Sequence, residues 1–306
     1  MIKEISKNLF FIQRGWLNAN HFVFNGGGKI LIDTGYIRDF EETKKLIEAT
    51  GVDLSSIDLI VSTHSHCDHI GGNKRIQEIS GCLIAIHWVD KQSIESRDDW
   101  ATWYRFYDQE AEFFPVGIPL EDGRKIYLDD LELEVIHTPG HARGGISLYS
   151  PEERFLISSD ALWDGDTGVL NTIVEGKDAP SVAKESLKKI SSLNIQTIYP
   201  GHGGIICNPK RAMERCIRRL ENFMKNPAKL GQDHLKKILI WVLLMKKGYP
   251  KDDFFNYLLT THWFKAVVDL YFEGRYQEKF DEIMEELIER NIVFIKDGYY
   301  HTTVHP

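Results

Sequence analysis

Four side chains that commonly bind metal ions fall within six consecutive positions of this chain. His64, His66, Asp68 and His69 follow residues 59–61, an apolar β-branched run that predicts a short buried strand. In an extended chain, residues two apart point to the same side, so His64, His66 and Asp68 can aim into one cavity. Imidazole and carboxylate groups together suit divalent transition metals. The spacing therefore predicts a metal site; a plain polar loop is the alternative.

A strand followed by a metal-competent residue recurs three times further along the chain. Strand-like runs at residues 131–136, 154–157 and 196–199 lead into His141, Asp160 and His202. Pro-Gly precedes both histidines and forces a tight turn at the end of each strand. Because binding groups gather at strand ends on rigid sheets, we expect these side chains to belong to the same site.

The segment His-x-His-x-Asp-His-x-Gly-Gly after a strand resembles the metallo-β-lactamase superfamily of hydrolases. The resemblance covers roughly residues 9–204, and every ligand position of the family is filled. It implies a first metal held by His64, His66 and His141, a second held by Asp68, His69 and His202, and Asp160 as the ligand that bridges both.

Some positions around these ligands follow the family pattern and others depart from it. Asp33 resembles the early aspartate that supports the metal loop from behind, although a turn residue is the alternative. Ser159 stands where a glycine usually precedes the bridging aspartate, and Ala142 stands where threonine often occurs. His137 is a supporting residue or merely polar. The diiron flavoproteins of this superfamily carry glutamate at the position of His66. A histidine there favours hydrolysis over the reduction of oxygen or nitric oxide. A mononuclear iron dioxygenase that acts on persulfides shares much of the same motif and is an alternative.

The resemblance implies two divalent metal ions, with zinc favoured and iron or manganese as alternatives. A metal-bridging hydroxide would attack a small ester or thioester, as in the hydroxyacylglutathione hydrolase (glyoxalase II) group. Asp68 is the expected catalytic residue, because it can also orient the nucleophile or shuttle its proton. A phosphodiesterase or endoribonuclease of the same superfamily, and a non-catalytic ligand sensor on the same scaffold, are the alternatives.

The order of strands and amphipathic helices, read with the resemblance, predicts an α+β fold. We expect two sheets with helices outside, a four-layer αβ/βα sandwich. The predicted strands lie at 8–13, 21–24, 29–32, 59–61, 82–87, 125–128, 131–136, 146–149, 154–157 and 196–199, and the helices at 38–50, 73–79 and 179–193. Residues 88–114 are rich in aromatic side chains at helical spacing, and we expect either core packing or a lid over the metals.

The last hundred residues predict a second unit, so we divide the chain into a catalytic domain at 1–208 and a helical domain at 209–306. Helices are expected at 209–224, 233–247, 251–259, 262–272 and 276–290, followed by a hairpin around Asp297-Gly298. Helices before a hairpin resemble a winged-helix appendage. The helix at 276–290 is strongly acidic and would repel phosphate, so we expect a cap over the site or a homodimer through the apolar run 238–245.

The composition limits the partners of the chain. Of 306 residues 42% are hydrophobic, which is ordinary for a globular protein, and the net charge of -8 argues against nucleic acid or anionic membranes as partners. Four cysteines without a paired motif indicate a reducing compartment, and no secretory signal is recognisable, so we expect a cytoplasmic enzyme of a small-molecule substrate. No apolar run approaches the ~20 residues that a membrane helix needs.

Overall fold

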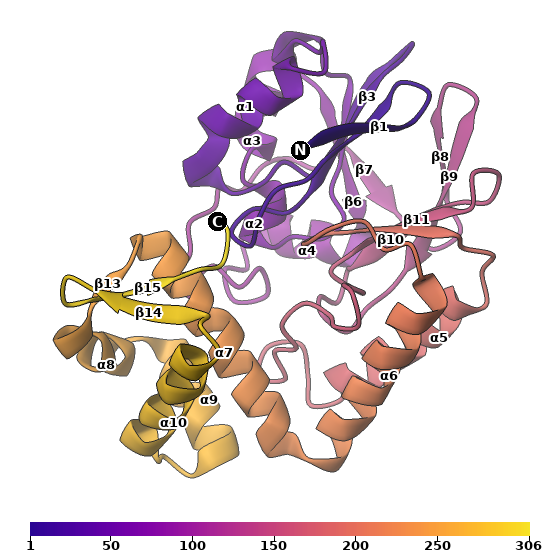
Figure 1. Cartoon of the computed structure of the whole chain (residues 1–306). Helices are drawn as coiled ribbons and strands as arrows, with labels where there is room; N and C mark the ends of the chain where they lie inside the picture. The colour runs from indigo at the N-terminus through magenta and orange to yellow at the C-terminus, as the bar shows by residue number, and fades with distance from the viewer.

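Seven strands form the first sheet, and they lie side by side in chain order. The computed structural model describes residues 1–306 (Figure 1). The strands are β1 (Ile2–Ser6), β2 (Leu9–Ile12), β3 (His21–Asn25), β4 (Lys29–Ile32), β5 (Leu59–Val61), β6 (Leu83–His87) and β7 (Ile118–Leu120). Pairing is antiparallel from β1 to β4 and parallel from β4 to β7. The sequence did not reveal β1 and β7, because β1 is a largely exposed edge strand and β7 has three residues, one of them proline.

Five strands form the second sheet, in the order β12-β11-β10-β9-β8. They are β8 (Lys125–Leu128), β9 (Leu131–His137), β10 (Ile146–Ser150), β11 (Phe155–Ser159) and β12 (Thr197–Pro200). The central strands β10 and β11 are buried along their whole length, including their serines. The two sheets face each other across a core that includes Phe11, Phe22, Leu133 and Phe155.

Helices cover the outer surface of each sheet, so the predicted αβ/βα sandwich is confirmed. On the first sheet, Leu31 and Ile84 pack against Phe40, Ile47 and Ile76 of the helices. On the second sheet, α5 and α6 provide the covering side chains. The helices of this part are η1 (Ile37–Asp39), α1 (Phe40–Glu48), η2 (Leu54–Ser56), α2 (Cys67–Ile70), α3 (Asn73–Ser80), α4 (Trp88–Ser96), α5 (Ala179–Ser191) and α6 (Pro209–Lys225).

The aromatic segment at 88–114 is helical only in α4, so the helical spacing of its remainder was misleading. Arg97 ends α4 in the left-handed conformation. The side chain of Asp98 then accepts hydrogen bonds from the backbone N–H groups of Trp100 and Ala101, at 3.1 and 2.9 Å. A side chain that takes over backbone donors in this way competes with a helix and favours a turn.

The C-terminal region contains α7 (Pro227–Lys246), α8 (Lys251–Thr260), α9 (His262–Phe272) and α10 (Tyr276–Glu289). A small sheet completes it in the order β13-β15-β14, from β13 (Tyr249–Pro250), β14 (Val293–Lys296) and β15 (Tyr299–Thr302). Helix α7 begins at Pro227 rather than at residue 233, because proline is well suited to the first position of a helix. The winged-helix likeness and the domain boundary after residue 208 stay predictions.

Helix α7 joins the two parts of the molecule (Figure 1). Its residues from Ile238 to Leu244 are buried within the chain itself. All of them except Trp241 belong to one core with α8, α9 and α10 and with Trp103 and Tyr107 of the aromatic segment. A homodimer through the C-terminal region, which stays a prediction, would therefore need another face. None of the helices combines the length and the apolar character required to cross a bilayer.

Candidate metal centre

The structure brings all seven predicted ligands together at one edge of the two sheets. They follow β5, β9, β11 and β12, whose ends meet there. Three overlapping groups have ligand atoms within 4.8 Å of one another: His64, His66 and His141; His64, His69 and Asp160; and Asp68, His69 and His202. The prediction that alternate residues of an extended chain point to one side holds for His64 and His66 only. Asp68 and His69 lie in the short helix α2 instead.

In the first group, each histidine directs one ring nitrogen toward the others. Nδ1 of His141 contacts the carbonyl oxygen of Val169 at 2.8 Å, and its Nε2 lies 2.9 Å from Nδ1 of His66. Nδ1 of His64 lies 3.4 Å from the hydroxyl of Ser159. The contacts with Val169 and Ser159 fix the orientation of His141 and His64 and leave Nε2 of each ring available for a metal.

The second group is held in the same manner. Nδ1 of His69 contacts Oδ2 of Asp33 at 2.8 Å, and Nδ1 of His202 contacts the carbonyl oxygen of Gly15 at 3.0 Å. Nε2 of His202 then lies 3.1 Å from Oδ2 of Asp68. Both histidines therefore present Nε2 to the cavity beside a carboxylate.

Asp160 lies between the two groups. Its Oδ2 is 3.4 Å from Nε2 of His141, and its Oδ1 is 3.5 and 3.8 Å from Nε2 of His69 and His202. Burial alone would raise the pKa of Asp160, but His202 and His69 outweigh burial and hold it well below its usual value. The carboxylate is therefore ionised, with one oxygen facing each group.

The chemistry of these side chains fits divalent cations. Nε2 of His64, His66 and His69 is buried without a hydrogen-bond partner. Buried polar atoms without a partner are costly and rare, and a cation would satisfy Nε2 of His64 and His69, whereas His66 faces the group through Nδ1. Burial and the neighbouring histidines lower the pKa of His64 and His66, so both rings are neutral, as a metal ligand must be.

Asp33 and Ser159 support the ligands from behind. Asp33 accepts hydrogen bonds from the backbone N–H and the hydroxyl of Thr63, at 2.8 and 2.7 Å, in addition to its contact with His69. This confirms the predicted supporting role. Ser159 adopts a left-handed backbone with φ +48°, which explains why glycine is usual at that position. Its hydroxyl lies 2.7 Å from the Thr63 hydroxyl.

Aromatic side chains close the cavity in front of the candidate ligands. The cavity measures about 50 Å³, and its walls include Trp16, Trp103, Tyr107, Trp163 and Trp241. The ring of Trp103 stacks on His66 at a centroid distance of 3.7 Å. The aromatic segment at 88–114 therefore contributes to the core and to the cavity wall at once.

Sequence reasoning missed several residues of the site. Trp16, Lys237 and Trp241 line the cavity from parts of the chain that carry no motif. Asp90 is buried on α4, and its Oδ2 accepts a hydrogen bond of 2.8 Å from the backbone N–H of Ser65, between two candidate ligands. Only the tertiary packing reveals these roles. His137 lies outside the cluster and stacks on His87.

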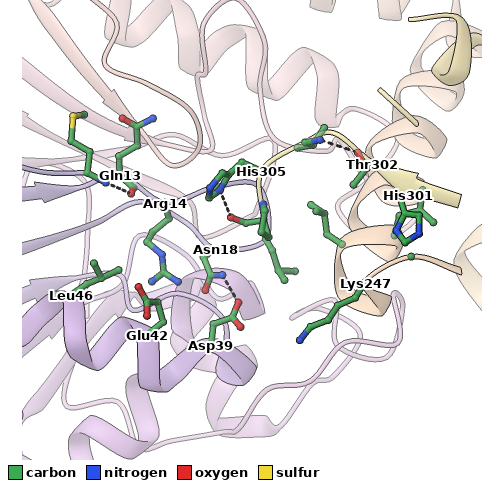
Figure 2. A pocket seen from close by; sticks show the side chains of 18 residues that line it. Gln13, Arg14, Asn18, Asp39, Glu42, Leu46, Lys247, His301, Thr302 and His305 are labelled. Atoms are coloured by element: carbon green, nitrogen blue, oxygen red, sulfur yellow. Dashed lines mark hydrogen bonds between the residues drawn. The ribbon is translucent and has the colours of Figure 1, made fainter. Parts of the chain in front are cut away.

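A much larger cavity, of about 960 Å³, lies elsewhere (Figure 2). Residues 13–18, α1, the end of α7 and the last residues of the chain surround it. Arg14 and Asn18 lie on one side, and Lys247 and His301 on the other. No candidate ligand lines this cavity, so its size does not make it the reaction site.

Comparison with known proteins identifies the family. The model of the "Metallo-beta-lactamase superfamily" matches residues 14–202. The "Beta-lactamase-like protein 2 homolog" of Caenorhabditis elegans is 32% identical over 204 residues, which are 65% of this chain and 59% of that protein. The "Acyl-coenzyme A thioesterase MBLAC2" of Bos taurus is 26% identical over 252 residues, 72% of this chain and 86% of that one.

A solved structure matches nearly the whole chain. A metallo-beta-lactamase family protein from Thermus thermophilus aligns with a TM-score of 0.64 and 18% identity, over 98% of this chain and 100% of that one. This similarity supports the fold, including the C-terminal region, and the family model covers most of the sandwich and all the candidate ligands. The chain therefore belongs to the metallo-beta-lactamase superfamily, a superfamily of metallo-hydrolases.

Proposed function

We propose that this chain is a dinuclear metal-dependent hydrolase of a small ester or thioester. The position of Asp160 carries the proposal, because its two oxygens face two different groups of histidines. In this assignment His64, His66 and His141 would hold one divalent cation, and Asp68, His69 and His202 would hold the other. Asp160 would serve as a ligand shared by both.

The residues of the chain have distinct tasks in this mechanism. Two divalent cations, zinc in our proposal, would supply an activated water and polarise the substrate carbonyl. Asp68 has the most exposed side chain among the candidate ligands, at 17%. Its Oδ2 can therefore orient the attacking water or carry its proton, with His202 as hydrogen-bond partner.

The walls of the cavity favour a carbonyl substrate over a phosphodiester. Lys237 is the cation of the cavity wall, and three acceptors, Asp166, Thr167 and Asp233, already occupy its ammonium group. No protein cation of the wall is thus free to pair with a phosphate, whereas the tryptophans suit an apolar acyl group. A relative named as an acyl-coenzyme A thioesterase agrees with this choice.

The test compares three substrates with the zinc-loaded protein: lactoylglutathione, a short-chain acyl-coenzyme A and bis(p-nitrophenyl) phosphate. We expect kcat/KM for at least one thioester to exceed that for the phosphodiester by more than about tenfold. The D160N variant serves as the inactive control. A clear preference for the phosphodiester would instead support the nuclease alternative, and metal binding without any hydrolysis would support a ligand sensor.

The location that we propose for this enzyme is the cytoplasm. All four cysteines are free in the structure, and three of them are buried. Free thiols are typical of a reducing compartment. The small-molecule substrate would be encountered there.

A further inference from the structure

The buried cation Lys237 connects the C-terminal helices to the loop behind the candidate metal centre. It lies on α7 and is only 6% exposed. Its Nζ is 3.1 Å from Oδ1 of Asp166, 2.8 Å from the carbonyl oxygen of Thr167 and 3.0 Å from Oδ2 of Asp233. These contacts use the three donors of an ammonium group, so Lys237 serves the protein itself rather than a substrate.

The loop that Lys237 holds contacts two candidate ligands directly. The hydroxyl of Thr167 and the backbone N–H of Gly168 both donate to the carbonyl oxygen of Asp160, at 2.9 Å. The carbonyl oxygen of Val169 contacts Nδ1 of His141 at 2.8 Å. A Cβ atom at Gly168 would lie 2.4 Å from that same nitrogen, so the loop and the ring are in close contact.

Trp163 gives Lys237 a further contact with this loop. The indole N–H of Trp163 donates to Oδ1 of Asp160 at 3.2 Å. The ammonium of Lys237 lies 5.3 Å from the centre of the same indole ring, within the range of a cation–π contact. Lys237 therefore contacts both ends of the loop from Trp163 to Thr167, and that loop contacts the bridging carboxylate.

The charges around Lys237 are balanced within the protein. Arg219 of α6 forms ion pairs with Asp166, at 2.9 Å, and with Asp233. Two cations thus face two carboxylates in a network in which Lys237 and Asp233 are largely buried, while Arg219 and Asp166 are partly exposed. Removing one cation would leave a carboxylate uncompensated, which is strongly destabilising when buried.

We propose that Lys237 is a positioning residue for the metal centre, acting through the loop from Trp163 to Val169. This inference rests on the proposed ligand set. It implies that the C-terminal helices set the geometry of Asp160 and His141, and that they are part of the catalytic unit. Groups that orient metal ligands typically change metal affinity by about 10–100-fold when they are removed.

The test measures metal affinity by competition with a chelator, and the visible spectrum of the Co²⁺-loaded protein, for the full chain. For K237M we expect affinity at least about tenfold weaker and an altered Co²⁺ spectrum. K237R, which keeps the charge, should recover part of both. K236M is the matched control, because Lys236 is the neighbouring lysine of α7 and pairs with Glu286 instead; it should behave as the unchanged protein.

The double variant D233N/K237M separates positioning from folding. It removes one charge of each sign and leaves the pair of Arg219 and Asp166, so thermal stability should recover relative to K237M while metal affinity stays low. Affinity that recovers together with stability, or K237M with unchanged affinity and spectrum, would overturn the role of Lys237. If the unchanged protein binds no metal, the proposed function fails first, and this inference fails with it.

Discussion

Ser159 shows how one side chain can replace the glycine that its backbone conformation favours. A non-glycine residue with φ +48° is strained by roughly 1 kcal/mol. The hydroxyl of Ser159 bonds to Thr63, which Asp33 in turn holds, so a hydrogen-bond network compensates for the strain. The structure thus explains a departure from the family pattern that the sequence alone left unexplained.

Two substitutions at this position should have different effects. S159A keeps the strained backbone and loses the hydrogen bonds, so we expect the free energy of unfolding to fall by about 1–2 kcal/mol. S159G loses the same bonds but relieves the strain, and it should fall between S159A and the unchanged protein. Urea unfolding of the metal-free forms measures both. An S159A variant as stable as the unchanged protein would show that the network contributes nothing.

Glu175 is a second residue whose environment has measurable consequences. Its carboxylate is 5% exposed and accepts a hydrogen bond of 2.7 Å from the indole N–H of Trp103. Burial raises the pKa of Glu175 from 4.5 to about 8, against the opposing effect of Trp103. The group is therefore neutral in the folded protein at pH 7, while it is ionised in the unfolded chain.

The pH dependence of stability follows from this shift. Because the folded pKa lies above the unfolded one, the free energy of unfolding should fall, relative to the variant E175Q, as pH rises from 4.5 to about 8. The difference should reach up to about 5 kcal/mol and be constant outside that window. Urea unfolding of both proteins at several pH values checks it. A difference independent of pH would mean that Glu175 is ionised in the folded state.

At the scale of elements, the strands that deliver the ligands could be predicted well. β5 and α9 have the predicted bounds, and the strands before His141, Asp160 and His202 end where turn residues and metal-competent residues follow. Apolar β-branched runs and Pro-Gly turns are local signals, so the sequence contains them. The loop between α4 and β7 could not be predicted, because tertiary contacts and the side chain of Asp98 decide its conformation.

The role of Asp98 in forming this turn can be tested, with its neighbour Asp99 as the control. D98A removes the acceptor for two backbone N–H groups at the start of the loop. We expect faster amide hydrogen exchange in residues 97–108 and a loss of stability of about 1 kcal/mol. D99A is the control, because the neighbouring carboxylate of Asp99 does not accept these two bonds. Equal exchange in the two variants would remove Asp98 as the cause of the turn.

At the scale of the molecule, the C-terminal region and the sandwich share their cores. Trp103, Phe106 and Val169 of the sandwich pack in one cluster with α7, α8, α9 and α10, and Trp241 of α7 packs in the core beneath the first sheet. The sequence predicted a helical cap as one alternative, but it could not show that α7 lines the metal cavity. Long-range packing of this kind leaves no local signal.

The shared core predicts that the two regions unfold together. Leu239 is fully buried in the common cluster, so L239A should lower the free energy of unfolding by about 3 kcal/mol. Hydrogen exchange should then accelerate in both the second sheet and α10, with one thermal transition. Separate transitions for the two regions would show that they are independent domains.

The number of metal ions per chain tests the central claim most directly. We predict two equivalents of zinc by elemental analysis of the unchanged protein after loading and desalting, and one equivalent for H202A, with hydrolysis largely lost. The same protein stripped by a chelator should be inactive and regain activity when zinc is restored. A loaded protein with one metal or none, or H202A with full occupancy and activity, would contradict the two-metal account.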